Sequence, residues 1–287
     1  MKKTILLLTM ITGLALFIVP SVSAVSLKMQ PLLYSESIAK GDTKKGFIDI
    51  SNPTGQTIKL QSSVQAFRQT DDNGSLQFYD NEQVSAGIIP DLKDFELGPR
   101  EAIRMYFLID GTKLPPGDVF AAIFVATKGQ QESRGVAESV RLGTILTIVN
   151  GTAGARQAAI ESLSTSWFQF GTAIAGNYRV KNTADPTQTT GFYPDVTVAV
   201  TPFTSSVVSK APLVTAGKSR EGSFSLQGDR FGIYKLTASY GDSQQSRWVF
   251  VVTGFWQWLA PLLVVIIIFA LFLLRPKRHK SRYFRAP

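Results

Sequence analysis

The chain contains no cysteine, and its single histidine, His279, lies in the C-terminal tail. Without cysteine it can form no disulfide framework, thiolate metal site or thiol-linked lipid anchor. Because the only histidine is in the tail, the region before it can assemble neither a Ser-His or Cys-His nucleophile pair nor a histidine-based metal site. These absences predict a protein that is not an enzyme and has no catalytic residues, no cofactor and no metal site.

Acidic side chains are the remaining candidates for catalysis or cation binding. Four of them surround one predicted hairpin turn: Asp71, Asp72, Asp80 and Glu82. A glycosidase needs only two carboxylates at the right separation, so that function stays open as a minor alternative. Asp72-Asn73-Gly74 is, however, ordinary turn chemistry, and its spacing does not match an EF-hand loop. An irregular cation site is a further minor alternative.

Positive charge is unevenly distributed along the chain. The formal net charge is +9, with 30 basic and 21 acidic residues. Lys2, Lys3 and six basic residues of the tail supply eight of the positive charges, so the stretch between them is nearly neutral. A nucleic-acid-binding domain concentrates positive charge on its folded surface. The distribution therefore predicts no nucleic-acid partner.

The first 24 residues have the features of a secretory signal peptide. Lys2 and Lys3 precede an apolar stretch from Ile5 to Val19, and Pro20-Ser21-Val22-Ser23-Ala24 supplies small residues for cleavage. We therefore expect residues 1–24 to be removed and the rest to be exported. An uncleaved anchor helix is the alternative.

A second apolar run occupies residues 255–274, interrupted only by Gln257 and Pro261. At about 1.5 Å per residue, 20 helical residues cross a hydrocarbon core of about 30 Å. The run thus predicts a single-pass transmembrane helix, with a basic cytoplasmic tail at 275–287 and the N-terminal domains outside the cell membrane. A buried core helix is the alternative. The residues expected to anchor the helix at the two membrane interfaces are Phe255, Trp256, Trp258, Arg275, Lys277 and Arg278.

Between these segments, short alternating runs are separated by turns rich in glycine and proline. Ile103, Met105, Phe107 and Ile109 share one face of a predicted strand, and Val196, Val198 and Val200 share one face of another. This pattern predicts an all-β fold: two tandem Ig-like β-sandwiches followed by one transmembrane helix. We place the domains at 25–150 and 155–253, on either side of the flexible sequence Asn150-Gly151-Thr152-Ala153-Gly154.

Aromatic residues in the second domain could bind a partner or fill the core. Because alternate aromatic residues usually face the core of a sandwich, we expect Phe168 and Phe170 to be buried, leaving Trp167 and Tyr193 as surface candidates. The tyrosine at 234 is expected to be structural.

One long β-branched run, residues 136–149, is a candidate for binding by strand addition. An open sheet edge can accept an extended segment of another protein. The candidate partner strand carries Val140, Leu142, Leu146 and Ile148 on one face. An ordinary central strand explains the same pattern.

The first domain also resembles known families. Gly46-Phe47-Ile48-Asp49-Ile50-Ser51-Asn52-Pro53-Thr54, a strand ending in Asn and a small turn, resembles the first domain of periplasmic pilus chaperones, as do Phe95 to Met105 and Leu114 to Phe120. The order of signal peptide, chaperone-like domain, second Ig-like domain, span and basic tail is similar to that of the WxL-interacting surface proteins of Gram-positive bacteria.

Each resemblance implies a function. The WxL-interacting proteins imply a membrane-anchored adhesion or binding protein that engages peptidoglycan or another surface protein. The pilus chaperones imply the alternative, a membrane-tethered chaperone or accessory subunit that assembles surface or pilus proteins. Those chaperones carry a basic residue in the last strand of the first domain, whereas Thr144 to Ile148 contain none and Arg141 comes several residues earlier.

Overall fold

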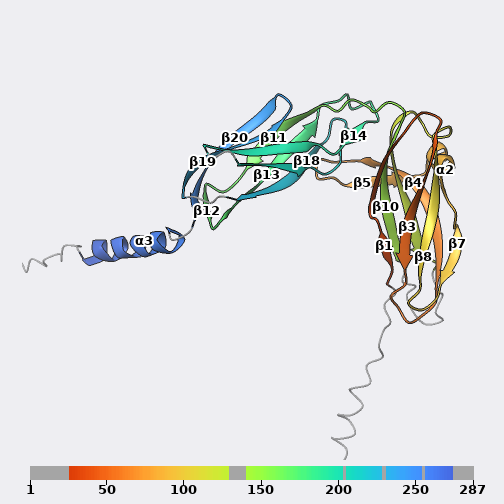
Figure 1. Ribbon diagram of the computed structural model, residues 1–287, viewed down its shortest axis with the longest axis horizontal. Helices are drawn as coiled ribbons and strands as arrows, with labels where there is room; N and C mark the ends of the chain where they lie inside the picture. The colour runs from red at the N-terminus through yellow and green to blue at the C-terminus, as the bar shows by residue number, and fades with distance from the viewer. Residues whose placement is uncertain (1–25, 129–139, 203–204, 228–230, 254–255, 274–287) are drawn as a thin grey trace, which may run out of the picture. The chain divides into compact units, whose positions relative to one another are not determined.

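The protein is described by a computed structural model, which covers residues 26–128, 140–202, 205–227, 231–253 and 256–273 (Figure 1). Most of these residues are in β-strands, and they divide into two compact units. The first unit contains the described residues up to 67 and residues 78–152. The second contains residues 68–77 and those from 153 onward. Each unit has two main sheets and its own hydrophobic core, the arrangement of an Ig-like β-sandwich.

One sheet of the first unit has the strand order β1-β3-β8-β6, and the other has the order β2-β10-β9-β4-β5 with β7 beside β4. A single short helix, α2 (Glu82–Gly87), completes the described elements of this unit. The strands are β1 (Lys28–Gln30), β2 (Leu33–Ile38), β3 (Thr43–Ser51), β4 (Ile58–Gln69), β5 (Leu76–Tyr79), β6 (Ile88–Pro90), β7 (Asp94–Leu97), β8 (Ala102–Asp110), β9 (Gly117–Thr127) and β10 (Arg141–Asn150).

Alternating side chains from the two sheets form the core of the first unit. Met105, Phe107 and Ile109 of β8 are buried and Ile103 is partly buried against them, which confirms the face predicted from the sequence. Met29 of β1 and Ile38 of β2 also lie in this core. The N-terminal stretch therefore contributes to both sheets, because it crosses from one to the other between β1 and β2.

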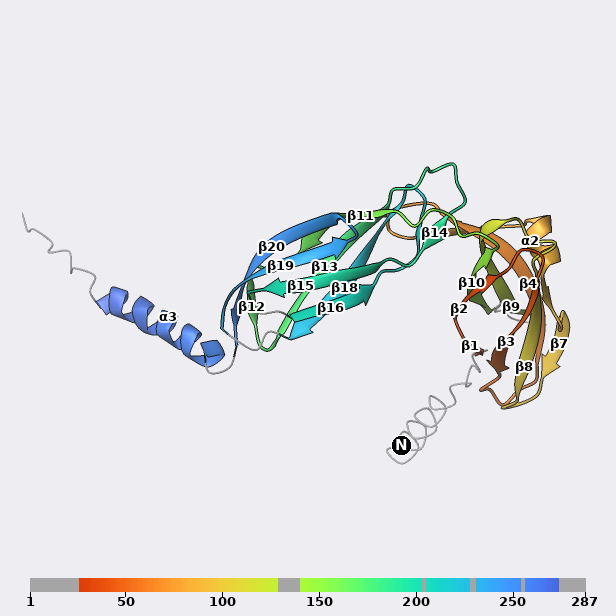
Figure 2. The same cartoon turned by 45° about the horizontal axis from the view of Figure 1, so that its top comes forward.

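The second unit has the sheets β11-β13-β18 and β12-β20-β19-β15-β16, with the small pair β14-β17 (Figure 2). Val196, Val198 and Val200 are buried in its core, as predicted, together with Tyr234. The strands are β11 (Ala158–Ser164), β12 (Phe168–Phe170), β13 (Ala173–Asn182), β14 (Gly191–Phe192), β15 (Asp195–Thr201), β16 (Ser205–Lys210), β17 (Val214–Thr215), β18 (Ser219–Gln227), β19 (Gly232–Tyr240) and β20 (Ser243–Val252).

A glycine faces an aromatic ring across neighbouring strands at four places in the two units. A Cβ atom added to any of these glycines would lie 2.2 to 2.8 Å from the facing ring, so each ring occupies the space above its glycine. Such pairs compensate for the missing side chain of a strand glycine. The pairs are Gly46 with Phe107, Gly143 with Phe124, Gly176 with Phe224 and Gly222 with Tyr178.

A helix, α3 (Trp256–Leu273), follows the second unit. Within the ranges that the structure describes, no helix combines the length and the apolar character needed to span a membrane. The predicted signal peptide at 1–24 and basic tail at 275–287 lie outside the described residues. The transmembrane segment therefore stays a prediction.

Candidate functional site

Three of the four acidic residues considered for catalysis have hydrogen-bond partners, and the fourth lies at the start of a helix. Asp71 caps the β4–β5 turn: its Oδ1 accepts backbone N–H bonds from Asn73 at 3.0 Å, Gly74 at 2.8 Å and Ser75 at 2.8 Å. The Ser75 hydroxyl and these amides stabilise the carboxylate, so the pKa of Asp71 lies below its usual value. Asp80 accepts a bond from Gln65 at 2.9 Å, and Glu82 lies in the first turn of α2.

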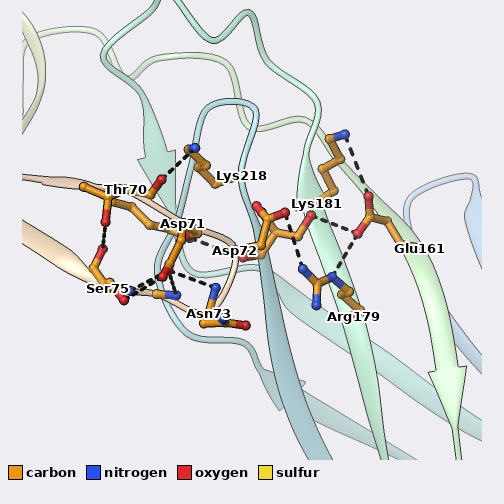
Figure 3. A network of polar contacts seen from close by, with 12 residues as sticks. Thr70, Asp71, Asp72, Asn73, Ser75, Glu161, Arg179, Lys181 and Lys218 are labelled. Atoms are coloured by element: carbon orange, nitrogen blue, oxygen red, sulfur yellow. Dashed lines mark hydrogen bonds and ion pairs between the residues drawn. The ribbon is translucent and has the colours of Figure 1, made fainter.

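Asp72 belongs to a polar network in the second unit, to which residues 68–77 are assigned (Figure 3). Its Oδ1 accepts the Ser219 amide at 3.0 Å, and its Oδ2 lies 3.4 Å from the Arg179 guanidinium. Arg179 also lies 3.3 Å from Glu161, which accepts the Ser219 hydroxyl at 2.8 Å. These carboxylates are engaged in charge pairs and turn capping. Among the described residues, no group of three or more acidic or histidine side chains is placed to hold a metal ion.

Strand β10, which carries the predicted partner residues, lies between two neighbours for only part of its length. It pairs with β9 from Arg141 to Asn150, but its parallel pairing with β2 begins at Ile145. Over residues 141–144, none of the described strands pairs with the side of β10 that faces away from β9. We call this stretch the open segment of β10.

The backbone groups along the open edge follow from the alternation of a β-strand. The Ile145 amide donates to the Leu32 carbonyl at 2.9 Å, which shows that Ile145 points its polar groups toward β2. Because this direction repeats every second residue, Arg141 and Gly143 present theirs along the same edge. The Leu142 and Thr144 groups point toward β9. The open segment therefore offers two N–H donors and two C=O acceptors.

The predicted partner residues all lie on the core side of β10. Leu146 and Ile148 are buried, whereas Val140 and Leu142 are partly buried against the same core. The second half of the candidate strand is thus a central strand with both edges hydrogen-bonded, because β2 supplies the missing neighbour. The candidate for strand addition is thereby reduced to residues 141–144, since residues 136–139 of the predicted run lie outside the described residues.

Two exposed leucines stand beside the open segment and were not expected from the sequence. Leu32 and Leu33 are 60% and 58% exposed, and Leu33 is the register partner of Ile145, where pairing with β2 begins. The only sequence signal for them is their apolar character just after Pro31. Isolated exposed leucines are common. It is their position at the end of an open edge that makes them candidates.

Arg141 anchors the start of the open segment on the outer face of the sheet. Its guanidinium lies 3.7 Å from the centre of the Phe124 ring and donates to the Gln65 side chain at 2.6 Å. Phe124 in turn packs on Phe78, with ring centres 4.9 Å apart. These contacts hold the Arg141 side chain against the outer face of the sheet. At the other end of the open segment, the Thr144 hydroxyl donates to the Pro31 carbonyl at 2.7 Å.

The outer face of the other sheet of the first unit carries an aromatic platform. Phe47 and Tyr106 are directly opposite each other on β3 and β8, and both are exposed. Next to them, Arg104 forms a two-bond ion pair with Asp49, at 2.7 and 2.9 Å, and lies 4.0 Å above the Phe47 ring. The hydrogen bond from Arg104 lowers the pKa of Asp49 below its usual value.

A shallow cavity of about 490 Å³ adjoins this platform, with Lys45, Asp91 and Tyr106 among its lining residues. The platform thus combines stacking surface with charged groups of both signs, a combination suited to polar ligands such as sugars.

Most of the predicted membrane anchors cannot be placed. Phe255, Arg275, Lys277 and Arg278 lie outside the described residues, and Trp256 and Trp258 belong to α3.

Phe168 and Phe170, expected in the core, are instead 54% and 66% exposed, so that expectation is wrong. They lie on the outer face of the sheet, where Phe168 packs on Phe250 with ring centres 5.3 Å apart.

No protein-family model matches the chain, and no curated protein sequence matches it either. The resemblance to WxL-interacting proteins therefore stays a prediction. The chain is structurally similar to periplasmic pilus chaperones. One is the Escherichia coli chaperone DraB, with a TM-score of 0.40 and 14% identity over 78% of this chain and 98% of that one.

Two further similar structures come from complexes. One is the chaperone–tip adhesion subunit pre-assembly complex CsuC-CsuE from the archaic chaperone-usher Csu pili of Acinetobacter baumannii, with a TM-score of 0.39 and 13% identity over 79% of this chain and 99% of that one. The other is the Salmonella enterica SafA pilin in complex with the SafB chaperone, with a TM-score of 0.37 and 11% identity over 80% and 98% of the two chains.

Proposed function

We propose that this chain is a non-enzymatic binding protein of the cell envelope that holds an extended segment of another surface protein by strand addition beside the open segment of β10. A role in assembling surface subunits, as a tethered chaperone, fits this mode of binding. The observation that carries the proposal is that β10 has a partner on only one side over residues 141–144.

The energetics of the edge indicate what the partner must supply. Each added backbone hydrogen bond contributes about 0.5–1.5 kcal/mol net, so four give about 2–6 kcal/mol. Holding a flexible segment in place costs at least as much, because association alone costs about 4–15 kcal/mol. Covering the remaining exposed surface of Leu32 and Leu33 adds about 2–4 kcal/mol. The partner segment therefore needs apolar side chains that contact these leucines.

The proposal includes a membrane tether. In it, residues 1–24 direct export, residues 255–274 span the cell membrane and residues 275–287 stay in the cytoplasm, so that both sandwiches face outward. The support is the sequence: 20 consecutive, almost wholly apolar residues are followed by a tail of 13 residues of which six are lysine or arginine.

Site-specific photocrosslinking of the full chain on cells tests the proposed function. A benzophenone amino acid replaces Leu33 at the open edge or, as the matched control, Val208, which is 62% exposed on the edge strand β16. We expect an adduct at position 33 that maps to a segment of alternating apolar residues in one envelope protein, and no such adduct at 208.

A second variant distinguishes a crosslink that depends on strand addition from one that forms only because another protein lies near Leu33. Arg141→Pro removes no N–H that pairs with β9, so the β9 pairing survives. It also removes the side-chain contacts of Arg141 with Phe124 and Gln65, which the control variant Arg141→Ala removes alone. We expect Arg141→Pro to abolish the adduct at position 33 while resistance to proteolysis is retained. An adduct that persists unchanged in Arg141→Pro, or equal adducts at 33 and 208, would contradict the proposal.

The aromatic platform supports a second candidate function, binding of peptidoglycan. Sugar rings stack on exposed aromatic faces, and Tyr106 is exposed beside Phe47, one face of which is covered by the Arg104 guanidinium. Retention of the detergent-solubilised full chain on insoluble peptidoglycan, lost in the Phe47→Ala/Tyr106→Ala double variant, would support this function. Retention that the double variant leaves unchanged would exclude the platform.

A further inference from the structure

An exposed aromatic patch lies at one end of the larger sheet of the second unit. It consists of the exposed side chains of Trp167, Phe168, Phe170, Phe231 and Ile233, together with the partly buried Phe250. Ring contacts make the patch continuous: Phe168 lies 6.4 Å from Trp167 and 5.3 Å from Phe250, and Phe231 lies 5.2 Å from Phe250. Monomeric proteins rarely expose a contiguous apolar surface of this kind without a use for it.

The polarity of the same sheet face changes steadily along β19 and β20. In the patch, Ile233 is paired with Phe250. The next pair of residues on the same outer face is Lys235 with Trp248. The following rows are polar: Thr237 hydrogen-bonds to Ser246 at 2.9 Å, and Ser239 is paired with Gln244. On β19 and β20, the apolar surface is therefore confined to one end of the strands.

That end is where the chain leaves the sandwich toward α3. β20 runs from the polar rows to the patch and ends at Val252, and α3 begins at Trp256. Four extended residues span at most about 14 Å. The environment of the first residue of α3 therefore lies no more than about 14 Å from the end of β20.

We infer that the aromatic patch inserts into the interface of the lipid bilayer that the following helix enters. This inference rests on the proposed membrane tether. Tryptophan and phenylalanine favour the boundary between headgroups and acyl chains. Lys235 in the adjoining row is placed to meet anionic headgroups, whereas the Thr and Ser rows stay in water. The second unit would then rest on the membrane by this end of its sheet.

Quenching of tryptophan emission by brominated lipid tests the inference in the full chain. The chain has four tryptophans, at 167, 248, 256 and 258, so single-tryptophan variants are made by replacing the others with phenylalanine. Each is reconstituted in phosphatidylcholine nanodiscs with and without bromine near the headgroup. A variant with Ser246→Trp as its only tryptophan reports on the polar end of the same face.

We expect the emission of Trp167 and of Trp256 to fall at least twofold in brominated lipid, and that of Ser246→Trp to stay constant. Phe170→Ser, at the most exposed position of the patch, should weaken the quenching of Trp167 at least twofold without disturbing the core. Quenching of Trp256 without quenching of Trp167 would overturn the inference and leave the tether intact. The same result is expected if the patch binds a protein partner instead of lipid. Quenching of neither would overturn the tether itself, and the inference with it.

Discussion

Replacing Gly222 by alanine would test the pairing of strand glycines with aromatic rings. Gly222 on β18 faces Tyr178 on β13, and an added Cβ would lie 2.4 Å from the ring carbon Cζ and 2.5 Å from the hydroxyl oxygen. The ring cannot easily move aside, because Tyr178 is 1% exposed and its hydroxyl contacts the Ser209 hydroxyl at 2.9 Å. Ser209 in turn donates to the Ser223 carbonyl at 2.8 Å.

The magnitude follows from two opposing effects. Alanine in a strand is normally favoured over glycine by about 0.5–1 kcal/mol, because glycine loses more backbone entropy on folding. Overpacking a fully occupied core costs about 1–3 kcal/mol, and the displaced hydroxyl would weaken a partly buried hydrogen bond by about another 1 kcal/mol. The expected net effect of Gly222→Ala is a loss of about 1–3 kcal/mol in the stability of the second unit.

Pulse proteolysis in urea measures this effect, because the fragments of the two units can be followed separately and the first unit serves as an internal reference. Gly55→Ala is a separate control, read on the fragment of the first unit to which Gly55 belongs, since nothing lies within 4 Å of a Cβ at that position. In the Tyr178→Leu background, Gly222→Ala should cost less than half as much as in the native chain. Unchanged or increased stability of Gly222→Ala in the native background would refute the assignment.

Three further predictions concern the first unit and the β4–β5 turn. Asn52 is 1% exposed and donates to the carbonyls of Gln56, Leu97 and Gly98, so Asn52→Asp, which replaces donors with an acceptor, should destabilise the first unit by about 2–4 kcal/mol in the same urea assay. The carboxyl of Asp71 should titrate in a carbon-13 NMR experiment with a midpoint below 3.8. Because its folded pKa is lowered, its contribution to stability is present above that pH and is lost as pH falls through the folded value. Arg104→Ala should leave the thermal unfolding of the first unit almost unchanged, since its ion pair with Asp49 is exposed to solvent, and a clear fall in the unfolding temperature would contradict this prediction.

The alternation of residues along the chain predicted most of the sandwich architecture, and its one clear failure is instructive. Met105, Phe107 and Ile109, and likewise Val196, Val198 and Val200, were assigned to the correct face because each run has one apolar and one mixed face. Phe168 and Phe170 share a face as expected, yet that face points outward. The alternation of residues along a strand shows that residues i and i+2 lie on the same side of a sheet. Over a run as short as Phe168-Gln169-Phe170, this alternation does not show which side is buried.

The location of the open edge could not be predicted, because it depends on strands far apart in the sequence. Whether β10 is central or at an edge is decided by β2, which is more than 100 residues earlier and pairs with only six residues of β10. No local pattern encodes where that pairing stops. For the same reason, Leu32 and Leu33 became candidates only once the register had placed them beside the open segment.

The most direct test of strand addition is amide hydrogen exchange, resolved to single residues, in the full chain with and without the partner captured at position 33. Strand addition predicts that the Arg141 and Gly143 amides gain protection on binding, whereas the Leu142 and Thr144 amides, which already point toward β9, change little. A bound partner that leaves the exchange of Arg141 and Gly143 unaltered would contradict the proposed binding mode.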